Sequence, residues 1–208
     1  MMMVSPMQKM SLGVRRLLKD RSGLAAVEFA MIFPMMVVMF FGVLELSAAI
    51  AVDRKATLVA RTLSDLTSQM VSVADADLIS FGEAAKAIMT PYPGSPLVSS
   101  VTEVYVDSVS GVARVQWSKG LTISATGTVA IAATAPYNAG AVVTLPPTLV
   151  VAKGTYVIWS EVSYKYTPAI GYVLAKTGMS FKDTAYTRPR TALCVIYPTG
   201  GSSTCPTL

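Results

Sequence analysis

The chain has 208 residues, of which 52% are hydrophobic and 14% are charged, and its formal net charge is +5. This length fits one membrane segment and one modest globular domain, which excludes an enzyme of many domains, and the composition favours contact with a membrane. The sequence contains no His, which excludes Ser-His triads, Cys-His dyads and the usual zinc sites, and two Cys residues alone cannot complete a tetrahedral metal site.

The positive charge is concentrated ahead of the first long apolar run. The basic residues there are Lys9, Arg15, Arg16, Lys19 and Arg21, and only Asp20 opposes them. The rest of the chain is nearly neutral and has no basic stripe interleaved with aromatic side chains, so we do not expect a nucleic-acid partner. Glycine-rich phosphate loops and the S-x-x-K spacing are also missing from the sequence. We therefore expect no enzyme activity, no cofactor, no metal and no small-molecule substrate.

An apolar run from Leu24 to Val52 predicts a transmembrane helix over residues 24–52. It is interrupted by Glu28, Pro34, Glu45 and a few small residues, and as a helix it reaches about 43 Å, more than the ~30 Å of hydrocarbon in a bilayer. The excess of basic residues before the run predicts a cytoplasmic N-terminus and an exported remainder, anchored in the inner membrane. A cleaved secretory signal is the competing interpretation, but the run is too long, holds a carboxylate and lacks a clear A-x-A cleavage site.

Glu28 requires an explanation, because a carboxylate in a membrane helix costs a few kcal/mol on insertion scales. One interpretation is that Glu28 lies in the membrane interface, seven residues after Arg21. The other is that the chain is cut after Gly23, which leaves the amine of Leu24 as a new N-terminus. In a bundle of staggered parallel helices, this amine can meet the Glu28 carboxylate of a neighbouring subunit, and the pair fixes the register of the helices.

The residues around this position resemble a known processing signal. "RSG" followed by "LAAVEF" is similar to a type IVb prepilin processing site, and "AAVEFAMIFPMMVVMFFGVLEL" resembles the start of the TadE-like pseudopilins (TadE/TadG family) of tight-adherence (Flp) pilus systems. The matching positions are Gly23, Glu28, Phe29, Pro34, Gly42 and Glu45. The exported part of this chain is larger than in the short TadE pattern.

This resemblance implies a minor pilin or pseudopilin that takes part in pilus assembly. Residues 1–23 would be a basic leader, removed by a prepilin peptidase between Gly23 and Leu24, and the partners would be that peptidase and other pilins of the same system. The resemblance also implies that Glu28, Phe29, Pro34 and Glu45 take part in assembly. An uncleaved single-pass anchor that presents a periplasmic interaction module stays open as the alternative.

Two residues of the run have further consequences for helix packing. Pro34 has no N–H, so it leaves the carbonyl of Ala30 without its helical donor and is expected to kink the helix. Glu45 lies about 25 Å along the axis from Glu28 and roughly 100° around it, so the two carboxylates do not share a face. We expect Glu45 at the periplasmic boundary, solvated or paired with a basic residue of a partner.

Residues 53–94 form a predicted amphipathic helical region. Val59, Leu63, Leu66 and Met70 recur at helical spacing, which predicts that the membrane helix continues to about residue 72 with an apolar stripe that seats the globular domain. A second helix is predicted over residues 73–89, with Asp75 or Asp77 as its N-cap and "TPYPGSP" as its stop.

Residues 95–208 read as a mainly antiparallel β domain, so the predicted fold class is α+β. Strands are expected over residues 97–108 and 111–119, joined by a turn, and over 127–134, 141–145, 148–152, 155–166 and 184–198, with a loop at 167–183. In "TYVIWSEVSYKY", Tyr156, Ile158, Val162, Tyr164 and Tyr166 alternate with Trp159, Glu161, Ser163 and Lys165, which predicts a half-buried strand with core aromatic residues. Cys194 and Cys205 enclose a turn-rich segment and are expected to form a disulfide in an oxidising periplasm.

Overall fold

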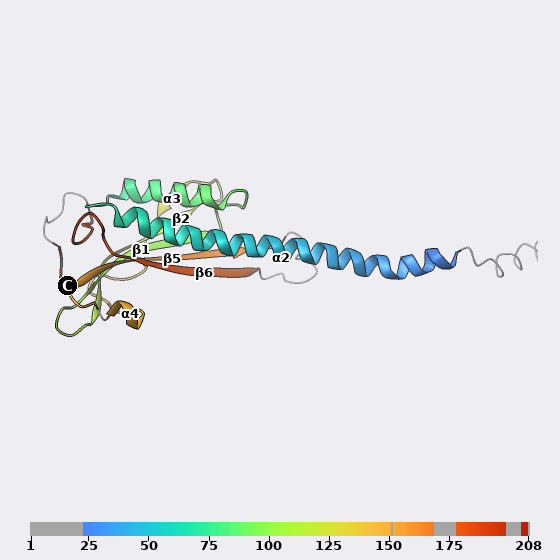
Figure 1. The fold of residues 1–208 in the computed structure, drawn as a ribbon. Coiled ribbons are helices and arrows are strands. Elements are labelled where there is room, and N and C mark those ends of the chain that lie inside the picture. The colour runs from blue at the N-terminus through green and yellow to red at the C-terminus, as the bar shows by residue number, and fades with distance from the viewer. Residues whose placement is uncertain (1–22, 151, 169–177, 199–204, 208) are drawn as a thin grey trace, which may run out of the picture. The chain divides into compact units, whose positions relative to one another are not determined.

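The computed structural model describes residues 23–150, 152–168, 178–198 and 205–207, so the predicted leader before Gly23 lies outside the described residues (Figure 1). The chain divides into two units, Met1–Leu46 and Ser47–Leu208. The element order is a long helix α2, a helix α3, strands β1 to β4, a short helix α4, and strands β5 and β6. This order confirms the predicted α+β fold, with a long apolar N-terminal helix followed by a mainly antiparallel sheet.

Helix α2 (Leu24–Ser68) contains 45 residues and includes Pro34. Its first turn closes with the bond from the Val27 N–H to the Gly23 carbonyl at 3.1 Å. In the second unit, α2 buries a stripe of small and branched residues at helical spacing: Ala49, Val52, Ala56, Val59, Ala60, Leu63, Ser64, Thr67 and Ser68. The predicted amphipathic continuation of the helix is therefore confirmed up to residue 68.

The end of α2 comes four residues earlier than predicted. The Thr67 hydroxyl donates to the Leu63 carbonyl and the Ser68 hydroxyl to the Asp65 carbonyl, so these side chains bind groups of their own helix. The chain then leaves the helical path and forms an isolated parallel bridge between Ser72 and Ile196. This pairing with a segment far along the sequence has no signal in the local periodicity.

Helix α3 (Asp75–Met89) confirms the predicted second helix, but its N-cap is Ala74. The prediction that Asp75 or Asp77 is the cap is therefore wrong. Asp77 lies at the third helical position and accepts a hydrogen bond from the Ala74 N–H at 2.8 Å, which is the acidic half of a capping box. At the other end of α3, the Lys55 amine donates to the carbonyls of Ile88 and Thr90 at 2.7 and 2.8 Å.

The sheet is antiparallel in all its pairings and has the order β3-β2-β1-β5-β6, with β4 paired to β2. The strands are β1 (Leu97–Val106), β2 (Ala113–Ile123), β3 (Val129–Ile131), β4 (Val142–Val143), β5 (Thr155–Tyr166) and β6 (Met179–Thr187). The register between β1 and β2 shifts after Glu103. The predicted hairpin between the first two strands is confirmed, whereas β3 and β4 are shorter than expected.

Two predicted strands are wrong. In place of a strand at 148–152, the structure has the helix α4 (Pro147–Val150), because Pro147 is already fixed in a helical φ and the N–H groups of Leu149 and Val150 bind the Pro146 carbonyl. The last strand spans residues 179–187 and not 184–198, so the C-terminal part of the predicted loop at 167–183 is strand. Beyond Thr187 the strand cannot continue past Pro189, which has no N–H to donate.

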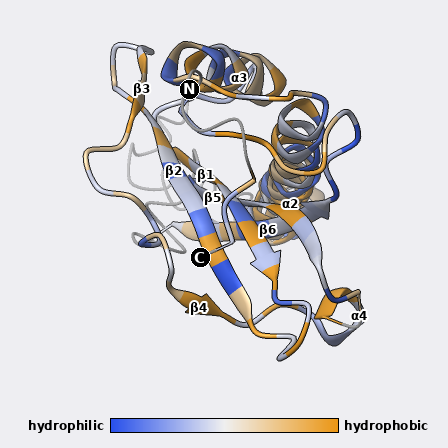
Figure 2. Ribbon diagram, turned by 90° about the vertical axis from the view of Figure 1, so that its left-hand side faces the viewer, coloured by the Kyte–Doolittle hydropathy of each residue, from blue (hydrophilic) through white to orange (hydrophobic). Residues whose placement is uncertain are grey.

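Hydrophobic clusters cover the sheet on both faces. Helices α2 and α3 lie together on one side of it (Figure 2), over a cluster that includes Val101, Leu121, Ile158, Val162 and Tyr164. The opposite face carries a smaller cluster of Val104, Val106, Ala113, Val115, Leu145 and Trp159.

The prediction that β5 is half-buried is wrong for residues 156–160, because both faces of the strand are buried there. The prediction holds for residues 161–166, where buried and less buried residues alternate. The aromatic residues of β5 are core residues, as predicted.

Candidate functional site

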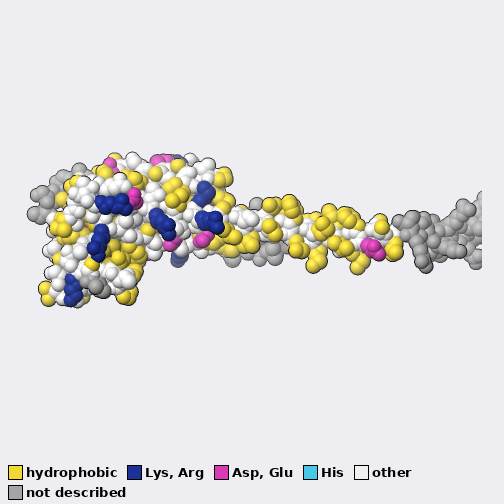
Figure 3. Space-filling model, viewed as in Figure 1, with side chains coloured by type: hydrophobic (Ala, Val, Ile, Leu, Met, Phe, Trp, Pro, Cys, Tyr) yellow, Lys and Arg dark blue, Asp and Glu magenta, His cyan; other side chains and the backbone are white. Residues whose placement is uncertain are grey.

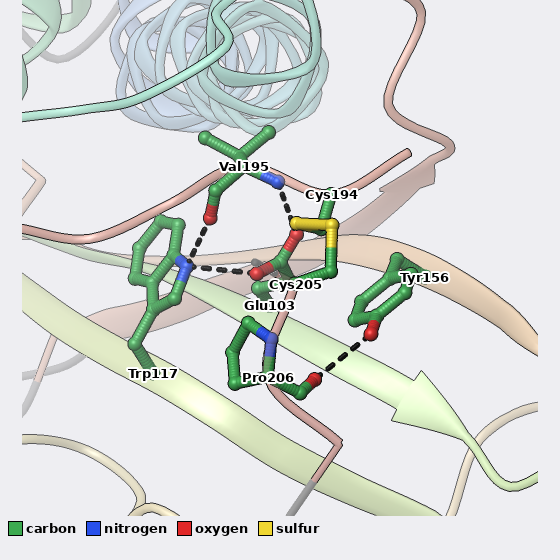
Figure 4. The surroundings of a disulfide bond; sticks show 7 residues. All are labelled: Glu103, Trp117, Tyr156, Cys194, Val195, Cys205 and Pro206. Atoms are coloured by element: carbon green, nitrogen blue, oxygen red, sulfur yellow. Dashed lines mark hydrogen bonds between the residues drawn. A yellow bond between two sulfur atoms is a disulfide. The ribbon is translucent and has the colours of Figure 1, made fainter. Parts of the chain in front are cut away.

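The C-terminal segment is fixed to the sheet by a disulfide and a buried carboxylate (Figure 4). Cys194 and Cys205 form a disulfide with their Cα atoms 5.7 Å apart, which confirms the expected pair. The Tyr156 hydroxyl, from β5, donates to the Pro206 carbonyl at 2.8 Å. Residues on both sides of the undescribed stretch 199–204 are thus held against the same sheet.

Glu103 is the acceptor at the centre of this attachment. One of its carboxylate oxygens accepts from the Val195 N–H at 2.6 Å, and the other accepts from the Trp117 indole Nε1–H at 3.0 Å. The same indole N–H also lies 2.8 Å from the Val195 carbonyl. Glu103 and Trp117 are paired in register on β1 and β2. Their side chains therefore lie next to each other, and together they bind the backbone N–H and carbonyl of Val195 (Figure 4).

The burial of Glu103 changes its acidity. The side chain has no exposed surface, and desolvation raises its pKa to about 7, although the hydrogen bonds from Val195 and Trp117 act in the opposite direction. Both bonds require acceptor oxygens, so they favour the ionised form. Glu103 is therefore a titrating group near neutral pH that joins β1 to the C-terminal segment.

Sequence reasoning did not identify Glu103 or Trp117. One signal was present: in "VSSVTEVYV" Glu103 is a charged residue within a run of apolar and small polar residues. A charged residue within a buried strand requires a hydrogen-bonding partner. The partner itself, the backbone of Val195, lies 92 residues away and could not be found from the local pattern.

The part of α2 in the first unit consists almost entirely of exposed apolar side chains (Figure 3). Leu24 and Phe29 keep 60% and 59% of their surfaces exposed, and the same holds for most of the residues that follow. By length and composition this helix is able to cross a membrane. An apolar surface this extensive is expected to be covered by lipid or by other helices.

The predicted processing residues lie at the start of this helix. Gly23 is the residue before α2, and Leu24 is its first residue. A Cβ atom added at Gly23 would meet nothing within 4 Å, so packing among the described residues does not require a glycine at this position.

Gly42 shows the same feature inside the helix, where a Cβ atom would also meet nothing within 4 Å. A glycine in the interior of a helix costs about 1 kcal/mol relative to alanine. Small residues in membrane helices are typical of positions where a second helix approaches closely. Packing among the described residues therefore does not account for Gly42.

The predicted assembly residues all lie on α2. Glu28 is exposed, one turn after Leu24, and Phe29 packs its ring against Phe33 with centroids 5.4 Å apart. Pro34 lies inside the helix, and Glu45 is partly buried. The structure does not bring Glu28 and Glu45 together, in agreement with their helical separation.

Comparison with known proteins supports the interpretation of this helix. Residues 23–64 match the family model described as TadE-like protein. No curated protein and no solved structure matches the chain. The match begins at the predicted processing glycine and includes all the positions on which the resemblance was based. Residues 23–64 are therefore a TadE-like segment, as the sequence predicted.

Proposed function

We propose that the chain is a minor pilin or pseudopilin of a tight-adherence (Flp, type IVb) pilus system, inserted through α2 into the pilus or its initiating complex. The observation that carries this proposal is the TadE-like match over residues 23–64. It coincides with an exposed apolar helix, where Gly23, just before the helix, and Gly42, inside it, have no packing role among the described residues. A structural role of this kind requires no catalytic site.

The proposed mechanism begins with removal of the leader. A prepilin peptidase cuts between Gly23 and Leu24, which frees a positively charged amine at the start of α2. In a growing bundle of parallel helices, this amine pairs with the Glu28 carboxylate of the adjacent subunit. Each charge offsets the desolvation of the other, so the helices are held in one axial register.

The proposed topology places the N-terminus in the cytoplasm and the second unit in the periplasm or on the assembled fibre. The excess of basic residues before α2 supports this orientation. The Cys194–Cys205 disulfide supports it as well, because disulfides persist in oxidising compartments.

The experiment is to isolate surface fibres and membranes from cells that produce the tagged chain. We expect the chain in both fractions. Gly23→Ala, or a bulkier replacement, blocks leader removal, because the peptidase must accept the residue before the cut, and the chain then stays in the membrane fraction. Gly42→Ala is the control and leaves leader removal intact. If the wild-type chain keeps its leader and occurs only in membranes, the chain is an uncleaved anchor and the proposal is wrong.

A further inference from the structure

In the second unit, α2 presents a basic ridge on its exposed side. Arg54, Leu58 and Arg61 follow at spacings of four and three residues, which places them on one strip of the helix. All three are exposed, and Leu58 keeps 52% of its surface exposed. In Figure 3, Lys and Arg side chains lie over this part of the molecule, with Asp and Glu side chains beside some of them. Asp65, one turn further on, is paired with Arg190 at 2.6 Å. The exposed Asp53 lies beside Arg54 at the edge of the ridge, so the ridge carries two positive charges with one negative charge at its edge.

Helix α3 presents an acidic ridge of the same design. Asp75, Ile79 and Glu83 follow at spacings of four residues, all three are exposed, and Ile79 keeps 36% of its surface exposed. Asp75 accepts from the Tyr197 hydroxyl, and Glu83 is paired at the surface with Lys86. Each carboxylate has two oxygens with several acceptor sites, so both can receive a further donor.

The rest of the outward face of α3 is unlike that of a helix that faces only water. It consists of Ala76, Ser80 and Ala87, which are all exposed. A solvated helix face normally carries charged and long polar side chains. Small residues beside a ridge instead leave a groove into which the ridge of another helix can pack.

The two ridges match in charge and in length. Each has an apolar residue between two like charges, and the charges are separated by about 10 Å along α2 and about 12 Å along α3. When Leu58 lies against Ile79, both arginines therefore come opposite carboxylates. This contact cannot form within one chain, because α2 and α3 lie beside each other on the same side of the sheet with both ridges exposed (Figure 2).

We propose that the basic ridge of α2 packs against the acidic ridge of α3 in a second copy of this chain. The charge complementarity of the two ridges argues for this occupant. Because the two surfaces differ, the contact is heterologous, and each copy in a pair keeps one ridge of each kind available for the next copy. The inference goes beyond the proposed function, since it concerns the second unit and does not depend on leader removal.

The test is cross-linking of full-length chains in isolated membranes. One population carries Leu58→Cys and a second, differently tagged population carries Ile79→Cys, while the native cysteines are held in their disulfide. A short bismaleimide is expected to join the two populations at least tenfold more than it joins either population to itself. Val109→Cys, at a position with 82% exposure in the β1–β2 turn, replaces either partner as the control for random collisions.

Charge reversal tests the electrostatic part of the contact. Arg54→Glu with Arg61→Glu in every copy, or Asp75→Lys with Glu83→Lys in every copy, is expected to reduce the cross-link at least tenfold. A mixture of the two reversed chains restores it, which also shows that both have folded. Arg114→Glu with Lys153→Glu changes the net charge equally at exposed positions elsewhere and leaves the cross-link unchanged.

Three outcomes would overturn the proposal: cross-links mainly between identical positions, cross-links no stronger than those of Val109→Cys, or cross-links to a different membrane protein. The experiment is repeated in cells without the prepilin peptidase. In those cells, a cross-link between chains with intact leaders supports this inference independently of the proposed function. In cells with the peptidase, fibres whose processed chains show no cross-link overturn this inference and leave the proposed function intact.

Discussion

Glu103 is fully buried and accepts hydrogen bonds from two N–H donors. Its carboxylate receives the Val195 N–H and the Trp117 indole N–H, and burial raises its pKa from 4.5 to about 7. The folded state therefore binds a proton at pH values where the unfolded chain has lost it. Because the chain contains no His, side chains with ordinary pKa values contribute little to the pH dependence of stability between pH 5.5 and 7.5.

The first prediction follows from this sign. The free energy of unfolding falls as the pH rises from about 5 to about 7, by roughly 3 kcal/mol in total, and levels off above that range. Urea unfolding of the full-length chain in detergent at several pH values measures the slope. Glu103→Gln, which cannot ionise, removes most of it. An unchanged slope in that variant would assign the pH dependence to another group.

The second prediction concerns Glu28. Glu28→Ala leaves removal of the leader largely intact but reduces the amount of chain in isolated fibres, because the amine of the neighbouring Leu24 loses its partner. Immunoblots of fibre and membrane fractions measure both effects. Asp183→Ala is the control, since it removes a carboxylate from strand β6 of the second unit. Normal fibres in the Glu28→Ala strain would count directly against the pairing of charges.

At the scale of elements, α2 contains a glycine that its own fold does not need. Gly42→Leu is expected to leave the thermal stability of the chain in detergent unchanged or slightly higher, because glycine is the poorer helix former by about 1 kcal/mol. The same change should reduce incorporation into fibres, since a large side chain blocks close helix approach. Val38→Leu, at a position with 68% exposure, is the control. Equal incorporation of both variants would remove Gly42 from the assembly surface.

The C-terminal segment is the second element with a measurable contribution. Replacement of Cys194 and Cys205 by Ala is expected to lower the free energy of unfolding by about 2–3 kcal/mol, the loop-entropy effect of a short disulfide loop. The comparison of urea midpoints for the oxidised wild type, the reduced wild type and the double variant measures it. If the three midpoints agree, the hydrogen bonds to Val195 and Pro206 hold this segment without help from the disulfide.

Periodicity predicted the elements whose burial follows from neighbouring residues. It predicted α2, α3 and the β1–β2 hairpin, because their apolar residues recur at one spacing within a short stretch. It failed where distant segments decide burial or pairing. Residues 156–160 of β5 are covered on the second face by a cluster that includes Leu145. The first residues of β6 become strand because they pair with the end of β5.

At the scale of the whole molecule, the TadE-like segment could be predicted from the sequence, whereas the contact of Glu103 with the C-terminal segment could not. The TadE-like segment is linear, so its residues stand together in the chain and the match to a family model starts at Gly23. The Glu103 contact involves residues that meet only after folding. It could be found only once the sheet and the C-terminal segment were placed.

We propose that a cut after Gly23 creates the positive chain end that Glu28 meets in the adjoining copy. The most direct measurement is the intact mass of the full-length chain, extracted from membranes and from isolated fibres of the same cells. We expect a mature chain that begins with Leu24 in the fibres. A chain that still carries residues 1–23 in functional fibres would contradict it.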